Sequence, residues 1–501
     1  MIEPPFAAFD AAHSAGRAQL VWSRRIADTE TPVSAMLKLG GEGSGAFILE
    51  SVEGGSVRGR YSLLGFMPDL VFRACGQKAE VNRRFAKDRD AFEVMPDGPL
   101  GALRRLVAET RMDLPAELPP AFAGFVGYMG YETVGLVEPV AVPAHDPLQL
   151  PDMLFVRPSL ILVFDRLQDE LFIAAPVYPD GSDTRTAYAA AAERIETAEA
   201  RLAAPLPSAR PSVPTEFAGI TPHTPTGQYA AMVARAKDYI RAGDIFQVVL
   251  AQRFSTPFPL PPMSLYRSLR RINPSPFLYL LDLPGFALIG SSPEILVRVR
   301  GGEVTVRPIA GTRPRGGSAL EDAANRDSLL ADPKELAEHL MLLDLGRNDV
   351  GRVAAEGSVA VTERNSVEFY SHVMHIVSNV RGELAPGKDA IDALMAGFPA
   401  GTVSGAPKVR AMQIIAELEA EKRGAYAGGV GYFSPDGSMD SCIVLRTAVV
   451  KDGIMHIQAG AGIVADSDPA YEQRECEAKA GALVAAARDA LSRTADAGYG
   501  Q

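Results

Sequence analysis

Two pairs of glutamates in this chain share a spacing that suits metal binding. Glu335 and Glu338 lie three residues apart, and Glu472 and Glu475 repeat that spacing. At roughly 100° per residue, two helical positions three apart point about 60° from each other, so each pair sets two carboxylates side by side. Hard divalent cations take oxygen ligands of this kind. The two pairs therefore predict a divalent-cation site shared between two helices.

An ordinary structural role also explains these acids. Lys334 adjoins the first pair, and Lys479 stands four residues after Glu475, which is the spacing of an ion pair along a helix. Cys476 and Leu483 share a face with the second pair, so these carboxylates are expected to turn inward, where an unpaired charge is costly. From spacing alone, ion-paired helix faces and a shared metal both stay open.

Both pairs follow sequences that start helices. Asp332-Pro333 and Asp468-Pro469 each place a capping carboxylate before a proline at the first helical position. Glu335 also stands where a capping box has its acid. The stretch from Asp332 to Asp349 carries leucines at helical spacing, which predict its apolar stripe: Leu336, Leu340 and Leu343.

The rest of the chain predicts many strands and few helices. Strands are expected at 47–51, 60–65, 154–164, 170–174, 245–254, 277–283, 286–290, 294–299, 304–306, 372–380, 428–433, 441–450 and 455–458. Further helices are expected at 98–112, at 184–203, and after a cap at Thr226 as far as Ile240. Because the strands gather in groups, the pattern favours an α+β fold over a doubly wound parallel sheet. The proline-rich run PLPSARPSVP from Pro205 predicts a domain boundary.

Composition narrows the class of function. A chain of 501 residues has room for two or three domains. Its net charge of −11 and lack of a basic block argue against nucleic acid or a membrane surface as partner. No apolar run is long enough to span a bilayer, and MIEPPFAAFD does not read as a signal peptide. Cys75, Cys442 and Cys476 form no Cys-x-x-Cys pair, which favours the reducing cytoplasm.

Three glycine-bearing segments are expected to be loops: AGAGIVADSDP from Ala459, FPAGTVSGAPK from Phe398 and PIAGTRPRG from Pro308. The first approaches the dinucleotide fingerprint but lacks a surrounding βαβ unit, and the second lacks the Gly-Lys-Ser/Thr of a P-loop. Together they supply small residues and backbone N–H groups that a carboxylate can approach closely.

These segments belong to an ordered set with DPKELAEHLMLLDLGRND, SHVMHIVSNVRGEL and RGAYAGGVGYF. The set resembles the chorismate-utilising enzymes, and most closely the large synthase components of anthranilate synthases. The resemblance covers residues 225–485 densely and 21–177 more loosely. It implies a layered sandwich of largely antiparallel sheets flanked by helices. It also implies Mg²⁺-dependent conversion of chorismate and ammonia to anthranilate and pyruvate, the first step of tryptophan biosynthesis.

The resemblance assigns the site residues as well. Glu338 and Glu475 would bind Mg²⁺, with Glu335 and Glu472 holding its water shell. The predicted substrate-binding residues are Gly311, Thr312, Tyr426, Arg446, Gly460, Ala461 and Gly462. The predicted catalytic residues are Glu294, His375, Thr402, Gln247 and Lys479. Among these, Glu294 matches the general acid for the C4 hydroxyl, and His375 lies where it would assist loss of pyruvate. Arg446 suits bidentate capture of the enolpyruvyl carboxylate, unless a buried acid is its partner.

Two positions discriminate between family members. Gln247 stands where the water-adding relatives have a lysine that activates water. A neutral amide cannot act as a general base, but ammonia is already a nucleophile and needs no general base. Ala310 stands where aminodeoxychorismate synthase has a lysine. Both favour anthranilate as product. Aminodeoxychorismate synthase is the alternative, and a non-catalytic tryptophan-binding regulator of the same fold is another.

Regulation and assembly are also implied by the resemblance. Ser51 and the run Pro276-Phe277-Leu278 match tryptophan contacts, which predicts feedback inhibition. Residues 15–180 are thus predicted to be a tryptophan-regulatory region, 181–222 a helix plus linker, and 223–490 the chorismate-binding catalytic domain. No cysteine lies in a glutaminase-type nucleophile turn. Ammonia is therefore expected from a glutamine amidotransferase subunit, in a heterotetramer of two copies of each chain.

Overall fold

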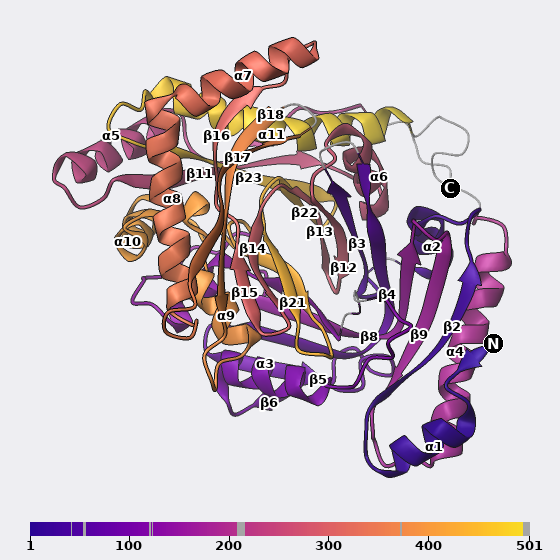
Figure 1. The fold of residues 1–501 in the computed structure, drawn as a ribbon. Helices are drawn as coiled ribbons and strands as arrows, with labels where there is room; N and C mark the ends of the chain where they lie inside the picture. The colour runs from indigo at the N-terminus through magenta and orange to yellow at the C-terminus, as the bar shows by residue number, and fades with distance from the viewer. Residues whose placement is uncertain are drawn as a thin grey trace.

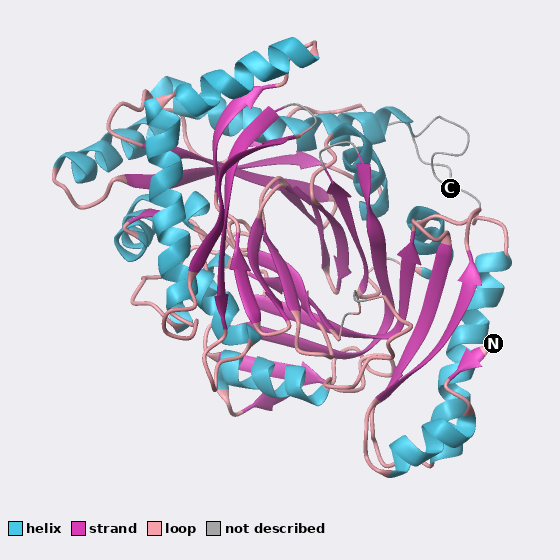
Figure 2. Ribbon diagram, viewed as in Figure 1, coloured by secondary structure: helices cyan, strands magenta, loops and turns pink. Residues whose placement is uncertain are grey.

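The computed structural model describes residues 1–41, 43–53, 57–119, 122, 124–207, 216–370 and 373–493. Its strands form two sheets that share one long pair, and within these ranges every ladder between named strands is antiparallel. Helices surround the strands on the outside (Figure 2). The predicted α+β fold, with largely antiparallel sheets flanked by helices, is confirmed.

The first sheet joins strands from both ends of the chain. Its order is β1 (Ile2–Glu3), β2 (Gln19–Ile26), β9 (Glu170–Val177), β8 (Met153–Asp165), β4 (Val57–Cys75), β3 (Ala46–Glu53), β12 (Phe277–Leu283), β13 (Phe286–Ser292), β22 (Thr447–Lys451), β23 (Ile454–Ile463), β11 (Gln247–Pro257) and β10 (Thr221–Pro222). The short β19 (Gly405–Ala406) pairs with the start of β11.

The second sheet branches from the same long pair. Its order is β6 (Glu93–Met95), β5 (Lys78–Asn82), β4, β8, β7 (Phe125–Met129), β20 (Gly429–Phe433), β21 (Met439–Ile443), β14 (Ile295–Arg300), β15 (Glu303–Val306), β18 (Val373–Glu383) and β17 (Ala360–Phe369). Strand β16 (Ile309–Pro314) also pairs with β18. Strands β4 and β8 pass between the sheets because β4 bends at Met67, whose φ is 51°, beside a register shift after Pro68.

Alternating side chains fill three layers of core. One cluster lies between the sheets and includes Phe47 and Tyr279 from the first sheet and Val430 from the second. The neighbouring residues on β3 and β12, such as Ile48 and Leu280, face outward into a second cluster under helices. A third cluster covers the outer face of the second sheet. This alternation is what a strand buried on both faces requires.

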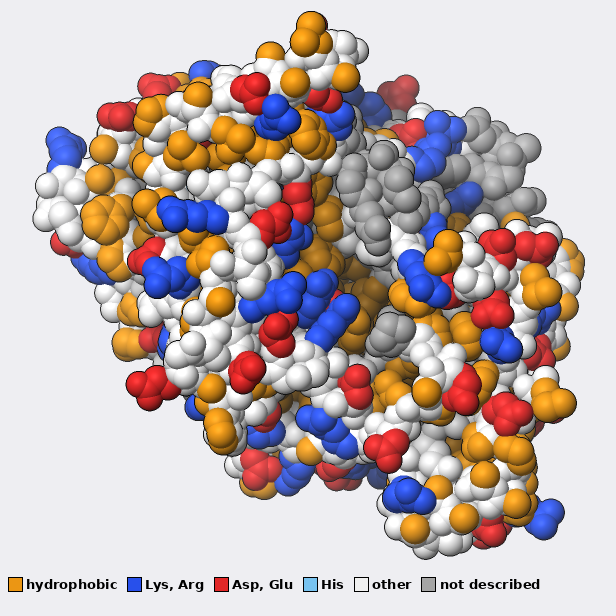
Figure 3. Space-filling model, in the orientation of Figure 1, with side chains coloured by type: hydrophobic (Ala, Val, Ile, Leu, Met, Phe, Trp, Pro, Cys, Tyr) orange, Lys and Arg blue, Asp and Glu red, His pale blue; other side chains and the backbone are white. Residues whose placement is uncertain are grey.

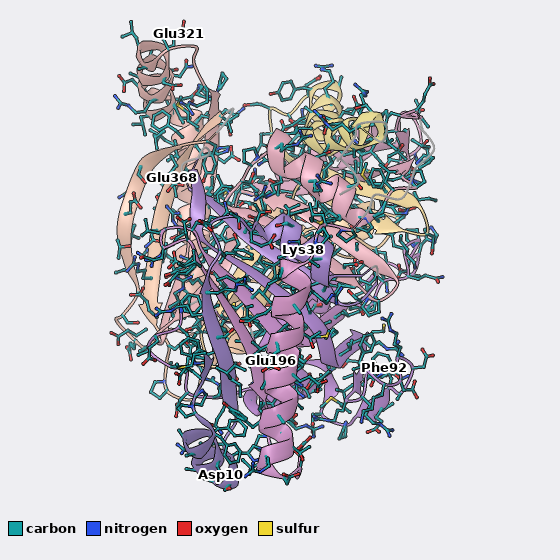
Figure 4. The ribbon with its side chains drawn as sticks, turned by 90° about the vertical axis from the view of Figure 1, so that its right-hand side faces the viewer. Asp10, Lys38, Phe92, Glu196, Glu321 and Glu368 are labelled. Carbon is teal, nitrogen blue, oxygen red and sulfur yellow. The ribbon has the colours of Figure 1, made fainter. Side chains whose placement is uncertain are left out.

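The helices are α1 (Phe6–Ser14), α2 (Pro32–Leu39), α3 (Gly98–Glu109), α4 (Thr184–Ala203), α5 (Gln228–Arg241), α6 (Pro262–Ile272), α7 (Ala319–Ala331), α8 (Pro333–Gly351), α9 (Ala390–Gly397), α10 (Lys408–Leu418) and α11 (Pro469–Ser492). Short 3₁₀ turns, η1 (Tyr131–Leu136) and η2 (Gly401–Val403), complete the set. Helix α7 extends beyond the sheets at the top of Figure 1, as Glu321 marks in Figure 4. None of the helices described here has the length and apolar character to cross a membrane.

Several predicted elements are confirmed, among them α4 and β12 with their full bounds. Others are wrong. The cap of α5 is Gly227, with φ 82°, and not Thr226. Residues 459–463 and 309–314 are strands and not loops, because each finds a partner strand that is distant in the sequence.

The predicted strand 441–450 is broken between β21 and β22, where Arg446 adopts a φ of 48°. Residue 372 and residues 208–214 of the proline-rich run lie outside the described residues. The division of the chain at 181–222 stays a prediction.

Candidate active site

The two predicted acid pairs lie at the starts of α8 and α11. Asp332 accepts hydrogen bonds from the backbone N–H groups of Lys334 and Glu335, and Asp468 accepts one from Tyr471. Both caps are therefore as predicted. The capping box at Glu335 is wrong, because its carboxylate instead accepts from the N–H of Thr312 at 3.3 Å and from Arg313 at 3.1 Å.

Glu338 and Glu472 are the inward members of the pairs. Burial raises the pKa of Glu338, and the nearby charge of Glu335 raises it further. The Gln247 amide donates a hydrogen bond to Glu338 at 3.2 Å and lowers this pKa. Burial likewise raises the pKa of Glu472. The charge of Glu475 adds to this rise, and a hydrogen bond with Ser467 opposes it.

The cations Lys334 and Lys479 connect the two helices electrostatically. Each of them lowers the pKa of both Glu338 and Glu472, although Lys334 belongs to α8 and Lys479 to α11. The first turns of the two helices therefore lie within electrostatic range of each other. Lys479 forms the predicted ion pair with Glu475 at 2.7 Å and also donates to the carbonyl of Gly460 at 2.9 Å.

The four carboxylates suit a hard cation chemically, since each supplies oxygen donors. Across the residues that the structure describes, no group of three or more His, Cys, Asp or Glu side chains converges as in a metal site. The outer acids are instead held by cations, Glu335 by Arg313 and Glu475 by Lys479. A bound cation would have to displace these contacts or draw α8 and α11 together.

Strand β23 lines the space beside these acids with glycines. Gly460 faces Tyr426, whose hydroxyl would lie 2.8 Å from an added Cβ, and Gly462 faces the Gln247 amide, 2.7 Å from an added Cβ. Ala461 pairs with Leu250 on β11 between them and is fully buried. Any larger residue at 460 or 462 would therefore collide with Tyr426 or Gln247. Gly460 and Gly462 therefore lie on one face of β23, and Ala461 lies on the other, in the core.

Glu294 is a buried carboxyl at the start of β14. The hydroxyl of Thr402, in η2, lies 3.0 and 3.1 Å from its two carboxylate oxygens. Burial raises the pKa of Glu294 to about 8, even though Thr402 and Arg446 both act to lower it. The group is therefore protonated at neutral pH and able to donate a proton.

Arg446 occupies the break between β21 and β22. Burial lowers the pKa of its guanidinium, and Glu294 and Tyr370 oppose that shift through space. In the described part of the chain its side chain makes no hydrogen bond or ion pair. The partner acid that would account for a structural arginine is therefore missing among these residues, and the cation is available to an anionic ligand.

His375, on β18, lies opposite Thr312 on β16. Its Nδ1 is 3.1 Å from the Gly311 carbonyl and 3.1 Å from the Thr312 hydroxyl. Burial lowers the pKa of His375 to about 4, so the ring is neutral at physiological pH. A neutral ring that donates its Nδ1–H to Gly311 keeps the Nε2 lone pair as a base.

Gly311 has a φ of 74° and its absent Cβ would lie 3.2 Å from a Glu335 carboxylate oxygen. A glycine is required here both by the backbone conformation and by the close approach of α8. The Gly311-Thr312 turn thus connects the first acid pair to His375.

The predicted effector residues lie together in a separate cavity. Ser51 on β3 and Pro276, Phe277 and Leu278 at the start of β12 line a cavity of about 800 Å³ between the two sheets. Figure 3 shows a hollow at the centre of this face, with Lys and Arg side chains at its edge. Glu50, next to Ser51, is buried and accepts from Arg270 and Arg166, which together bring its pKa below the usual value although burial alone would raise it.

Tyr370 is a residue that the sequence reasoning missed. Its ring packs edge-on against His375 with centroids 5.3 Å apart, and its hydroxyl donates to Glu368 at 2.9 Å. It also lines the cavity that contains Ser51, as does Glu368, which Figure 4 labels. Tyr370 directly precedes the histidine motif, so an aromatic residue at the end of β17 was the available signal. Arg313, beside the Gly-Thr turn, was missed as the partner of Glu335.

Comparison with known proteins gives one consistent family. A model described as chorismate binding enzyme matches residues 68–485. Anthranilate synthase component 1 of Cereibacter sphaeroides is 54% identical over 487 residues, 97% of each chain. The protein of the same name from Thermus thermophilus is 49% identical and covers 92% of this chain and 96% of its own.

Solved structures agree with the sequence relatives. The crystal structure of anthranilate synthase component I from Streptococcus pneumoniae TIGR4 superposes with a TM-score of 0.75 at 36% identity, covering 92% of this chain and 99% of the other. MenF, the menaquinone-specific isochorismate synthase of Escherichia coli, gives a TM-score of 0.69 at 20% identity over 94% of each chain, a likeness of fold.

Proposed function

The chain belongs to the chorismate-binding enzymes, in the group whose members are named anthranilate synthase component 1, and we propose that it converts chorismate and ammonia to anthranilate and pyruvate. This reaction adds ammonia at C2 of the ring, expels the C4 hydroxyl as water, and then eliminates pyruvate with loss of the C2 proton. The residues gathered around Glu294 match each of these needs.

The observation that carries the proposal is the buried, protonated Glu294 beside an arginine without a described partner. A hydroxyl group leaves as water only when it receives a proton, and Glu294, with its pKa raised to about 8 by burial, holds one at neutral pH. Thr402 fixes both carboxyl oxygens of Glu294, so the acid is oriented before the substrate arrives.

Arg446 would bind the enolpyruvyl carboxylate. Its guanidinium offers two parallel N–H donors that fit a carboxylate, and pairing would compensate its burial. Gly460 and Gly462 allow Tyr426 and Gln247 to approach β23 closely, because a Cβ at either position would lie within 2.8 Å of these side chains. His375, neutral and with its Nε2 free, is placed to accept the proton when pyruvate leaves.

Two side chains support ammonia as nucleophile. Gln247 donates to Glu338 and has no basic nitrogen with which to activate water. Ala310 offers no amine that could form a covalent bond to the ring. Ammonia reacts without either, since it carries its own lone pair.

Mg²⁺ is part of the proposal. Glu338 and Glu475 would hold it, and Glu335 and Glu472 would order its water. The raised pKa values of Glu338 and Glu472 support this, because such carboxylates lack enough positive charge nearby and a cation would supply it. When bound, the metal would hold the ring carboxylate and draw negative charge from the ring as C2 is attacked.

Tryptophan inhibition and a glutaminase partner complete the proposal. The cavity lined by Ser51 and residues 276–278 is large enough for an amino acid with an indole ring and combines apolar walls with polar groups. The relatives are named component 1, which supports a second, ammonia-supplying component. A heterotetramer of two copies of each chain is the assembly we expect.

A direct assay tests the proposal. The purified chain is mixed with chorismate, Mg²⁺ and an ammonium salt at mildly alkaline pH, and anthranilate fluorescence is followed with and without tryptophan. Fluorescence that requires Mg²⁺ and falls with tryptophan is expected. Chorismate consumed without this fluorescence would indicate aminodeoxychorismate synthase, and binding of tryptophan without turnover would indicate a non-catalytic regulator.

A further inference from the structure

Arg423 is a fully buried cation outside the predicted catalytic set. It lies between α10 and β20 and only 2% of its surface is exposed. Burying a guanidinium costs several kcal/mol unless hydrogen bonds replace the lost water. Arg423 makes these bonds with all parts of its fork. Nε and Nη2 donate to the Glu419 carboxylate at 2.8 and 2.6 Å, and Nη1 and Nη2 donate to the carbonyls of Val403 and Val249, each at 2.7 Å.

The backbone acceptors belong to segments that carry predicted site residues. Val403 directly follows Thr402, whose hydroxyl holds Glu294. Val249 lies two residues after Gln247 on β11 and is paired with Gly462 on β23. One guanidinium therefore joins the Thr402 turn to β11, in addition to the direct hydrogen bond from the Val249 N–H to the Ser404 carbonyl at 2.9 Å.

Its other contacts extend the same arrangement. The guanidinium lies 5.6 Å from the ring centroid of Tyr426, a predicted substrate residue, and 4.7 Å from that of Tyr131. Glu419, its ion-pair partner, also accepts from the N–H of Ala251 on β11 at 2.9 Å. Charge, stacking and backbone bonds thus converge behind the substrate surface.

The main chain of Arg423 is fixed independently. Glu132, in η1, accepts hydrogen bonds from the N–H groups of Arg423 and Gly424 at 2.7 and 3.0 Å. The N–H of Tyr131 in turn donates to the Gly424 carbonyl at 2.8 Å. Both ends of Arg423 are therefore constrained, the backbone by the N-terminal half of the chain and the side chain by the site.

We propose that Arg423 is a positioning residue for the chorismate reaction, which holds the Thr402 turn against β11 so that the Thr402 hydroxyl stays on Glu294. This inference rests on the proposed function. Arg423 acts through the backbone at Val403 and not through contact with the substrate. A lysine keeps the charge but has a single ammonium, which cannot serve the Glu419 carboxylate and two separate carbonyls in one geometry.

The test compares Arg423→Lys with Arg157→Lys. Arg157 is matched because it is also half of a two-bond pair, with Asp69 at 2.8 and 2.7 Å, and also lies over a tyrosine ring, at 4.1 Å from Tyr178, away from the site. Each variant is assayed for kcat, for KM of chorismate, and for the pH dependence of kcat at constant free ammonia. Backbone hydrogen exchange of residues 401–405 is measured in parallel.

For Arg423→Lys we expect kcat to fall by roughly 10- to 100-fold while KM changes less than about threefold, since misplacement of a catalytic group by about 1 Å costs up to a hundredfold. The alkaline limb of the pH profile of kcat should move to higher pH, because a weaker hydrogen bond from Thr402 raises the pKa of Glu294. Exchange in 401–405 should accelerate. Arg157→Lys should lower the thermal midpoint without any of these changes.

An Arg423→Lys variant with lowered stability but an unmoved pH limb and unchanged exchange would overturn the proposal and assign Arg423 a purely structural role. If the lysine variant does not fold, the pair Arg423→Met with Glu419→Gln removes both buried charges and is judged by the same readouts. If the unmodified chain makes no anthranilate, the proposed function fails, and the exchange of 401–405 still decides whether Arg423 holds this turn.

Discussion

The hydroxyl of Thr402 lies 3.0 and 3.1 Å from the two carboxylate oxygens of Glu294. This hydrogen bond and the burial of Glu294 act on its pKa in opposite directions. Burial raises the pKa of Glu294 to about 8, whereas donation from Thr402 favours the ionised form and lowers it. The strength of the acid therefore depends on a residue more than a hundred positions away in the chain.

Replacement of Thr402 by Val removes the donor and should raise the pKa of Glu294 further. Because the proposed general acid is the protonated form of Glu294, the alkaline limb of the kcat profile should move to higher pH by about 1 unit, the size of one hydrogen bond to a charged group. The profile must be recorded at constant free ammonia, since protonation removes the nucleophile. Thr402→Ser, which keeps the hydroxyl, is the control. A limb that stays in place in Thr402→Val would show that Glu294 does not set it.

The same pKa predicts how stability depends on pH. Folding shifts the pKa of Glu294 from 4.5 to about 8, so between these values the folded chain holds a proton that the unfolded chain has released. Stability therefore falls as pH rises through this window. Glu294→Gln removes the dependence. Relative to this variant, the unmodified chain should lose roughly 2 to 4 kcal/mol of unfolding free energy between pH 5 and 9, measured by urea titration. A constant difference would contradict the assigned burial.

Local signals in the sequence were sufficient for the helices that carry the acids. Asp332-Pro333 and Asp468-Pro469 fix the starts of α8 and α11, because capping and proline act within one turn. The buried face of α8 was less predictable. Leu340 was assigned to the apolar stripe but is 53% exposed, whereas His339 on the neighbouring face is fully buried. Which face is covered depends on β16 and β18, which are distant in the sequence.

The break at Arg446 could not be read from the chain. Residues 442–445 and 448–450 are apolar, and period-two alternation gives no sign that Arg446 between them adopts a positive φ. The motifs of the family named Arg446 as a substrate residue without revealing that backbone. Arg423 was missed for the opposite reason. Its neighbours are charged or glycine, which reads as an exposed loop, and its burial follows from contacts to three other segments.

Replacement of Arg446 by Met should separate binding from stability. The variant loses the cation that we propose for the enolpyruvyl carboxylate, so KM for chorismate should rise by roughly 100-fold or more. Its thermal midpoint should stay constant or rise, because no described acid is left unpaired. Arg423→Met is the contrast, since it strands the buried Glu419 and should lower the midpoint. A large loss of stability in Arg446→Met would mean that Arg446 has a structural partner.

The acid pairs predict a metal requirement with a defined location. Chelation should abolish turnover, and added Mg²⁺ should restore it. Glu338→Gln and Glu475→Gln should each raise the Mg²⁺ concentration at half-maximal rate by at least about tenfold, since each removes a charged ligand. Glu477→Gln, at an exposed position of α11 that points away from Glu475, is the control. If all three variants needed the same Mg²⁺ concentration for half-maximal rate, the metal site would not lie on these helices.

The effector cavity can be tested by filling it. Ser51 lines the cavity from β3, opposite residues on β20 and β21, so a phenyl ring at this position would occupy the space that tryptophan needs. Ser51→Phe should raise the tryptophan concentration for half-inhibition by at least about tenfold, and direct titration calorimetry should show a matching loss of affinity. Arg24→Gln, an exposed change on β2 outside the cavity, is the control for nonspecific effects. Comparing half-inhibition with the calorimetric affinity separates loss of tryptophan binding from loss of its effect on the reaction. Inhibition lost with affinity retained would place the tryptophan site elsewhere and leave Ser51 in the path from that site to the catalytic groups.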